Sequence, residues 1–156
     1  MATFYSTQGT KQNDPTAKNL LNGDSAQSSV VYGHASYIIT AALAAADVIY
    51  MFKIPKGYTP IADSFKLATD GVTATTCTAN LGTVLDPNAF IASNVDLNTA
   101  KTYLVSGDEG TANDGVETLT PTITTADGWV AVTIVALTGT ATAGQVINVS
   151  GLFAKA

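Results

Sequence analysis

Histidine and cysteine most often act as nucleophiles, bases and metal ligands, and this chain has one of each, His34 and Cys77. A Ser-His-Asp triad or a Cys–His pair depends on the fold, so counting alone does not exclude one. The chain has no Gly-x-Ser-x-Gly sequence, and neither residue lies at a turn, where a nucleophile is usually placed. One Cys and one His also exclude an internal disulfide and a His-rich metal site. We therefore predict no catalytic residue, and expect both side chains to be packed or at the surface.

Oxygen-bearing side chains gather in residues 108–115, which read Asp-Glu-Gly-Thr-Ala-Asn-Asp-Gly. Hard cations such as Ca²⁺ bind these groups, but the spacing differs from that of an EF-hand. A solvated turn needs the same residue types for its backbone angles. A glycosidase needs two acids facing each other in a cleft, and the sequence places no such pair. We predict no metal site and no cofactor, and ion binding by this loop is left open.

Aromatic side chains are the third candidates, because a row of them on strands can form a platform for sugars. Such residues more often belong to a core. Both interpretations apply to Tyr50, Phe52, Phe65, Tyr103, Trp129 and Phe153.

The charge balance argues against two classes of partner. The net charge is -5, and the seven basic residues are all Lys, with no Arg for bidentate phosphate or guanine contacts. An acidic chain without Arg is a poor candidate for nucleic acid. No apolar run of 18 residues is present, so we expect no membrane span. The first residues lack a basic region followed by an apolar core, so we expect no secretory signal.

The elements that position these residues are predicted strands. Residues 129–137 read Trp-Val-Ala-Val-Thr-Ile-Val-Ala-Leu, which is apolar or nearly so on both alternating faces and rich in β-branched residues. That pattern is typical of a central strand covered on both sides. Seven other segments predict strands, and Asp86-Pro87 predicts a single helical turn that runs to residue 91. The seven are residues 29–39, 47–54, 61–68, 75–81, 101–106, 116–125 and 145–153.

These segments, with turns between them, indicate an all-β fold: an antiparallel sandwich of about eight strands, jelly-roll-like, over residues 29–156. Residues 1–28 differ, because they are polar and show no lasting period of 2 or 3.6. We predict an extended N-terminal arm there, either disordered when free or ordered on a partner. Its candidate contact residues are Phe4, Tyr5, Lys11, Lys18, Leu20 and Leu21.

Four segments carry a resemblance to a known group. An Ala-rich run enters a strand and a Pro-Lys-Gly turn over residues 41–57, and Ala-Asn-Leu-Gly leads to Asp-Pro-Asn-Ala-Phe-Ile over residues 79–91. Leu-Thr-Pro precedes Asp-Gly-Trp over residues 119–129, and Thr-Ala-Thr-Ala-Gly-Gln-Val opens the last strand at residue 140. With these segments the chain resembles small β-rich virion proteins of tailed bacteriophages, especially capsid decoration or cement proteins.

The resemblance implies a protein without enzymatic activity, made in the host cytoplasm and attached to the outer surface of a capsid. Its implied partners are the major capsid protein and further copies of itself, as a trimer or another homo-oligomer. We expect Lys11 and Lys18 to meet acidic shell subunits. The alternatives are a tail- or fibre-associated module that binds a host glycan, a small carbohydrate-active enzyme, and a surface-layer or pilus-like protein.

Overall fold

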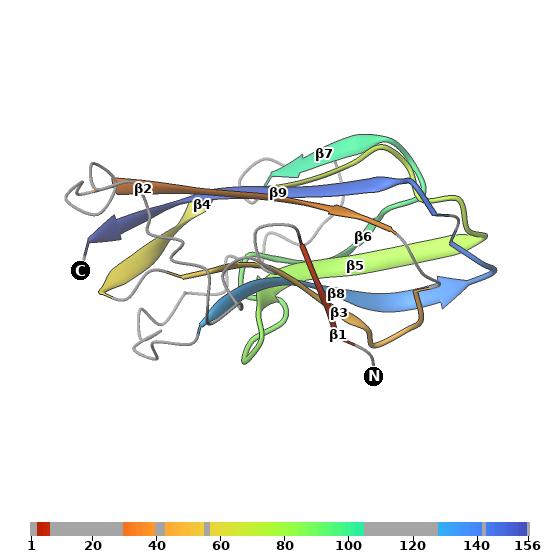
Figure 1. The fold of residues 1–156 in the computed structure, drawn as a ribbon, viewed down its shortest axis with the longest axis horizontal. Helices are drawn as coiled ribbons and strands as arrows, with labels where there is room; N and C mark the ends of the chain where they lie inside the picture. Colours follow the sequence, from red (N-terminus) through yellow and green to blue (C-terminus); the bar gives the residue numbers. More distant parts are fainter. Residues whose placement is uncertain are drawn as a thin grey trace, which may run out of the picture.

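The computed structural model describes residues 3–6, 30–39, 43–54, 57–104, 128–141 and 143–155. These residues form nine strands and no helix, in two sheets that lie face to face (Figure 1). The five-stranded sheet has the order β1 (Thr3–Tyr5), β3 (Val48–Lys53), β8 (Trp129–Thr138), β5 (Thr76–Thr83) and β6 (Ile91–Asp96). The four-stranded sheet has the order β2 (Val30–Ile38), β9 (Val146–Lys155), β4 (Tyr58–Thr69) and β7 (Lys101–Leu104).

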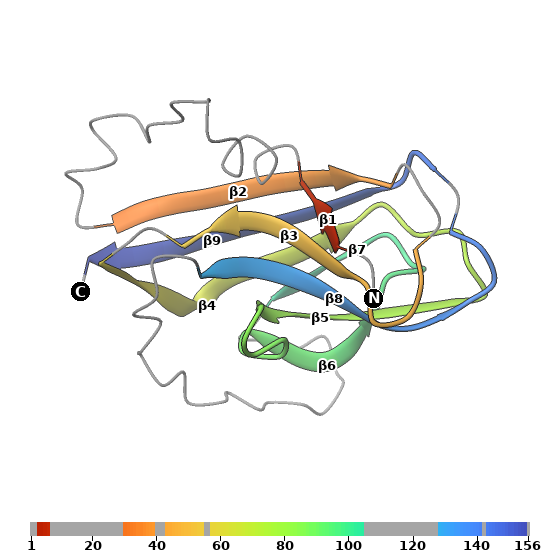
Figure 2. The ribbon, with the colours of Figure 1, turned by 60° about the horizontal axis from the view of Figure 1, so that its bottom comes forward.

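The strand order is that of a jelly roll. Strands β2 and β9, β3 and β8, β4 and β7, and β5 and β6 are antiparallel neighbours. Apart from β1, the first strand β2 is therefore paired with the last strand β9, and β4 lies beside β9 and β5 beside β8. Figure 2 shows the two layers and the loops that join them. The predicted all-β, jelly-roll-like sandwich is confirmed.

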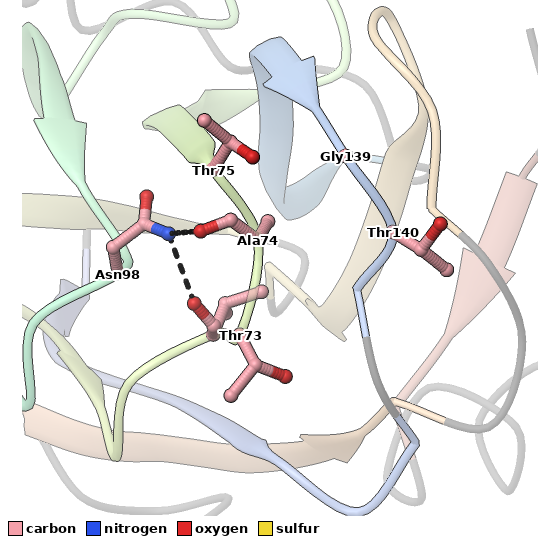
Figure 3. A pocket seen from close by; sticks show the side chains of 7 residues that line it. Thr73, Ala74, Thr75, Asn98, Gly139 and Thr140 are labelled. Carbon is pink, nitrogen blue, oxygen red and sulfur yellow. Dashed lines mark hydrogen bonds between the residues drawn. The ribbon is translucent and has the colours of Figure 1, made fainter.

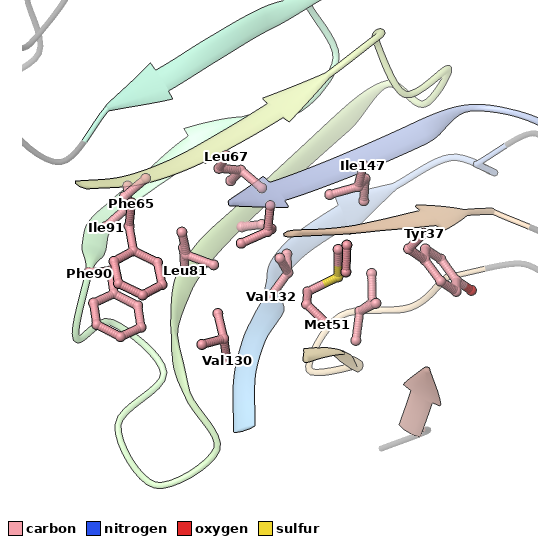
Figure 4. Packing of buried hydrophobic residues seen from close by; sticks show 14 of the residues in the cluster. Tyr37, Met51, Phe65, Leu67, Leu81, Phe90, Ile91, Val130, Val132 and Ile147 are labelled. Atoms are coloured by element: carbon pink, nitrogen blue, oxygen red, sulfur yellow. The ribbon is translucent and has the colours of Figure 1, made fainter. Parts of the chain in front are cut away.

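Strand β8 occupies the middle of its sheet, as its sequence predicts. Val130, Val132 and Ile134 point into the core and are fully buried. Trp129 and Ala131 lie on the opposite face of the strand and are buried as well. Both faces are thus covered, which explains why the segment lacks an alternation of apolar and polar residues. Figure 4 shows part of the core, with Val130 and Val132 of β8 near Leu81.

Phenylalanine rings fill the centre of the sandwich opposite a pair of glycines. Gly33 of β2 and Gly151 of β9 are directly opposite each other in the ladder. A Cβ atom on Gly33 would lie 2.6 Å from the ring of Phe52, and one on Gly151 would lie 2.5 Å from the ring of Phe65. Phe153 makes edge contacts with both rings, at centroid distances of 5.9 and 5.6 Å. The glycines therefore leave the space into which the rings pack.

The ring of Phe65 is held from its other side. It stacks on Phe90 with a centroid distance of 4.0 Å and an interplanar angle of 3°, as Figure 4 shows. Phe65 is fully buried and Phe90 nearly so. A side chain added at Gly151 consequently has no room unless this stack moves.

We predict that Gly151→Ala destabilises the fold by roughly 1–3 kcal/mol, because it overpacks the site against Phe65. The measurement is urea unfolding of a double-mutant cycle with Phe65→Leu, which removes the obstructing ring. In the Phe65→Leu background, Gly151→Ala is expected to cost less than about 1 kcal/mol. Ser150→Ala, on the outward side of the same strand, serves as the control and should change stability by less than about 0.5 kcal/mol. Equal costs of Gly151→Ala in both backgrounds would contradict the packing argument.

Seven of the eight predicted strands correspond to observed ones. The eighth, over residues 116–125, lies outside the described residues, as does the 108–115 loop. The seven are β2, β3, β4, β5, β7, β8 and β9. Pro60 lies inside β4 at a point where β7 does not reach, since β7 pairs only with Lys66–Thr69. The open side explains how a residue without an N–H is tolerated there.

The helical turn predicted from Asp86-Pro87 is wrong, and strand β6 was not predicted. The Thr83 hydroxyl accepts from the Asp86 N–H at 3.0 Å, and the Phe90 N–H donates to the Leu81 carbonyl at 3.0 Å. A helix would need Phe90 N–H to donate to Asp86 instead. Strand β6 was missed because it is rich in Asn, Asp and Ser and kinks at Asn94, which has a φ of 50°.

Residues 3–6 form part of the sandwich. Strand β1 pairs in parallel with β3, and Phe4 packs against the core and lies 6.0 Å from the ring of Tyr37. The main-chain N–H of Ser6 donates to the Tyr50 carbonyl at 2.8 Å, and its hydroxyl donates to the Met51 carbonyl. The other residues of the predicted arm, 1–2 and 7–28, lie outside the described residues.

Candidate functional site

His34 and Cys77 lie on different sheets and face different environments. His34 is exposed on the outward side of β2, where its ring stacks beside Tyr32 at 6.3 Å. Cys77 is fully buried in β5 and points into the core. The fold therefore does not bring them together, and no Cys–His pair is formed.

Burial sets the chemistry of Cys77. Desolvation, helped by the nearby negative charge of Asp96, raises the pKa of the Cys77 thiol from its usual 9.0 to about 11. The thiol is thus protonated at neutral pH, and the thiolate is the reactive form of cysteine. Cys77 acts as a small apolar residue of the core.

The raised pKa of Cys77 predicts a loss of stability at high pH. Below pH 9 the thiol is protonated in both states, whereas between pH 9 and 11 only the unfolded chain loses its proton. The unfolded state is then favoured as pH rises, by up to roughly 2–3 kcal/mol. Urea unfolding of the wild type and Cys77→Ala at intervals from pH 8 to 11, with reductant present, measures the difference. The free energy of unfolding of the wild type, relative to that of Cys77→Ala, should fall as pH rises across this window. A difference that does not depend on pH would contradict the raised pKa of Cys77.

The open hollow between the loops near β5 and β8 carries hydroxyl and amide groups. Its lining is Val72, Thr73, Ala74, Thr75, Asn98, Gly139 and Thr140, with no acid, base or thiol (Figure 3). The Asn98 amide donates to the carbonyls of Val72 and Ala74 at 3.0 and 2.5 Å, and its oxygen accepts from the Cys77 N–H at 2.6 Å. The side chain of Asn98 therefore holds neighbouring loops together through these hydrogen bonds. The residues that line the hollow include no groups for acid–base chemistry.

Asp47 is a buried carboxylate with a structural task. It is 3% exposed, and its Oδ2 accepts from the Ala44 N–H at 2.8 Å. This bond closes the turn that precedes β3, in which Ala46 has a φ of 68°. Across the described ranges, no three His, Cys, Asp or Glu side chains are grouped so as to hold a metal ion.

The six aromatic candidates divide into two groups. Phe52, Phe65 and Phe153 are buried in the core, so they cannot form a platform for sugars. Trp129 is 7% exposed and lies on the side of the five-stranded sheet that faces away from the core. Its ring centroid is 5.7 Å from that of Tyr5 and 5.4 Å from that of Tyr50. The Nζ of Lys53 lies 5.3 Å from the centroid of its ring. Tyr103 is partly buried, and its hydroxyl donates to the Asp96 carbonyl.

The candidate contact residues of the arm are described only in part. Phe4 and Tyr5 contact this chain's own Tyr37, Tyr50 and Trp129. Lys11, Lys18, Leu20 and Leu21 lie outside the described residues. The part of the chain that the structure describes also contains no helix long and apolar enough to span a membrane.

The outward side of the four-stranded sheet, which we call the outer face, gathers exposed apolar side chains. It carries five of the eight large hydrophobic side chains that are exposed in the described residues. Among the described side chains within these strands, Lys66 is the one Lys that points outward, and no Asp or Glu does. The five are Val30, Tyr32, Ile38, Ile61 and Leu104.

Sequence reasoning did not single out the outer face, although β2 carried a signal. Both alternating sets of its side chains are largely apolar, with Val31, Ala35 and Tyr37 in the core and Val30, Tyr32 and Ile38 outside. An edge strand of a sandwich needs one apolar side only. The second set therefore marks a surface suited to contact.

The fold and surface define a class: a jelly-roll sandwich whose described residues cluster no catalytic groups. Comparison with solved structures gives the same fold. A chain in the structure of the capsid of Ralstonia phage GP4 is similar with a TM-score of 0.56 at 18% identity, covering 99% of this chain and 99% of that one. A chain in the cyanophage Pam1 capsid asymmetric unit is similar with a TM-score of 0.50 at 16% identity, covering 92% and 97%. No family model and no curated protein matches the sequence.

Proposed function

We propose that this protein is a non-enzymatic virion structural protein, a decoration or cement protein attached to the outside of a phage capsid. The observation that carries the proposal is the likeness over nearly the whole chain to chains of two phage capsids, GP4 and Pam1. Its partners are the major capsid protein and further copies of itself. It is made in the host cytoplasm and resides on the outer capsid surface.

The outer face suits attachment to a shell. Its described residues include exposed apolar side chains and little charge, which resembles the centre of a protein–protein interface. A protein present in many copies needs only a modest affinity at each contact, because simultaneous binding at several contacts raises the overall affinity. A rigid sandwich also loses little conformational entropy on binding.

The central experiment uses capsids purified from phage that lack the gene for this protein. Adding the purified protein should give saturable binding in co-sedimentation and raise the temperature at which the capsids open. Imaging of wild-type virions should show the protein on the outside of the head. Binding to tails, or no association with particles, would overturn the proposal. A glycan array with the isolated protein tests the host-binding alternative.

We predict that Leu104→Asp weakens capsid binding at least tenfold, because it puts a charge into the outer face where an apolar contact forms. Leu85→Asp is the matched control. Leu85 is the most exposed large hydrophobic residue among those described, at 83%, and it lies in the loop between β5 and β6 of the other sheet. Binding affinity measured by titration of capsids with labelled protein should fall for the first variant alone. Equal losses for both, or loss only for Leu85→Asp, would reject the outer face as the attachment surface.

The arm supplies a second contact in this proposal, through Lys11, Lys18, Leu20 and Leu21. Replacing both lysines, as Lys11→Gln with Lys18→Gln, should reduce capsid binding several-fold at low salt and less at high salt, because ionic contacts are screened. Lys155→Gln, a change of the same kind at the far end of β9, is the control. Titrations at two salt concentrations measure the effect. A double variant that binds as the wild type does at low salt would remove the arm lysines from the interface.

A further inference from the structure

A row of polar side chains crosses the middle of the outer face. The ladders place His34 of β2 opposite Ser150 of β9, and Ser150 opposite Lys66 of β4. The three side chains point away from the core, since the adjoining Val149 and Leu67 point into it. His34 and Lys66 are exposed, and Ser150 is partly buried. We call His34, Ser150 and Lys66 the polar row.

The ladders also fix how close these side chains lie. The Ile39 N–H donates to the Gln145 carbonyl at 3.0 Å, in the same register as the β2–β9 pairs. Because hydrogen-bonded and non-hydrogen-bonded pairs alternate, His34 and Ser150 form a non-hydrogen-bonded pair, with Cα atoms about 4.5 Å apart. Lys66 is one strand spacing, about 4.8 Å, on the other side of Ser150. A single small group above Ser150 is thus within reach of all three side chains.

The donors of the polar row have no ligand within the protein. In the part of the chain that the structure describes, no hydrogen bond or ion pair involves the Lys66 ammonium, the Ser150 hydroxyl or the ring nitrogens of His34. The next row differs, because the Ser36 hydroxyl donates to Oδ1 of Asn148 at 2.5 Å. The polar row therefore directs its donors out of the molecule.

The charge of the polar row is positive, although the chain as a whole is acidic. The Lys66 ammonium carries a full positive charge, and a serine hydroxyl and a histidine ring N–H add two further donors. Asp70, at the end of the same strand, lies about 13 Å from Lys66, which exceeds the screening length at physiological salt. One oxygen of Asp70 also accepts from the Val146 N–H at 2.7 Å. The row thus presents an unneutralised positive charge on a chain with a net charge of -5.

Apolar side chains border the polar row on two sides. Tyr32 is 62% exposed, and its ring lies nearly parallel to that of His34, at an interplanar angle of 16°. Leu104 is 44% exposed and pairs with Lys66 across the ladder. A surface that covers both residues excludes water from the row between them, which strengthens an ionic contact made there.

We propose that the polar row binds the carboxylate of an Asp or Glu side chain of the capsid subunit beneath the protein. This inference rests on the proposed attachment through the outer face. The carboxylate lies above Ser150, where one of its oxygens accepts from the Lys66 ammonium. The other accepts from the Ser150 hydroxyl and a ring N–H of His34.

Charge complementarity favours a single carboxylate as the ligand. One ammonium matches one carboxylate, whereas a phosphate backbone needs several basic groups, and Lys66 is the one Lys that points outward among the described side chains of these strands. The rest of an acidic chain is repelled by an acidic partner surface. The polar row therefore determines which face approaches the shell and in which orientation it binds.

Titration of capsids that lack this protein with labelled variants tests the role of the charge. Lys66→Gln should weaken binding at least about tenfold at low salt and less at high salt, because the ionic contact is screened. Lys66→Arg keeps the charge and the donors, and should bind within about threefold of the wild type. Lys101→Gln, the matched control, removes an ammonium that lies over the ring of Tyr103, and should change binding less than about twofold.

A double-mutant cycle tests whether Ser150 and Lys66 bind the same group. Ser150→Ala should weaken capsid binding about threefold to tenfold in the wild-type background. In the Lys66→Gln background the same change should weaken it less, since the carboxylate is no longer held above Ser150. Equal losses in both backgrounds would reject a shared ligand.

Carbodiimide cross-linking identifies the ligand directly, because the reagent joins an amine to a carboxylate in contact with it, with loss of water. Mass spectrometry of the protein bound to capsids should find an amide between Lys66 and an Asp or Glu of the capsid subunit. Lys66→Arg should still bind but give no cross-link from this position.

The outcomes separate this inference from the proposed function. Capsid binding that is unaffected by Lys66→Gln would overturn the inference and retain the attachment. A cross-link from Lys66 to another copy of this chain, or equal losses for Lys66→Gln and Lys101→Gln, would overturn it as well. Absence of any binding to capsids would reject the proposed function, and this inference with it.

Discussion

The contact between phenylalanine rings across the two sheets is the constraint on which the rest of the structure depends. Phe52 comes from the five-stranded sheet, and Phe65 and Phe153 come from the four-stranded sheet. They meet at the one place where a β2–β9 pair has no side chains, opposite Gly33 and Gly151. A Cβ atom at Gly33 or Gly151 would lie 2.6 or 2.5 Å from a ring, so the rings pack here only because both positions lack side chains. The glycine pair therefore fixes how β2 and β9 are aligned, and with them the distance between the layers.

Burial in the sandwich also removes reactive groups of the described residues from contact with a substrate. Cys77 and Asp47 are buried groups of kinds that elsewhere serve in catalysis, but here they are used for packing and for closing a turn. His34 remains accessible, but no Asp or Glu is among the described side chains of its face. Among the described residues, the outer face carries five of the eight large hydrophobic side chains that are exposed.

Most of the fold followed from the sequence, because the seven predicted strands were bounded by clear turns and either alternated or, like β8, were apolar on both faces. Strand β6 could not be predicted, since half of its residues are Ser, Asn and Asp and its ladder with β5 shifts register, near where the Asn80 side chain accepts from the Asn94 N–H at 3.0 Å. The turn at residues 83–90 was misjudged for a similar reason: Asp86-Pro87 permits a helix start, but Phe90 is held by Leu81. Long-range bonds of this kind leave no periodic trace in a sequence. The outer face left a trace in the two apolar sets of β2, but its neighbours on β4 and β7 could be known only once the strand order was known.

Composition adds a reason why this surface suits association. Only 12% of residues are charged, and there is no Arg and little Glu. Long charged side chains lose about 1.5–2 kcal/mol of rotamer entropy when they are fixed, whereas Ser, Thr and Val lose less. The outer face presents Ser36, Thr102 and Ser150 between its apolar residues, so ordering it against another flat surface costs little entropy. A face of this kind binds weakly for its area but with little reorganisation, which is the property that repeated contacts on a large assembly require.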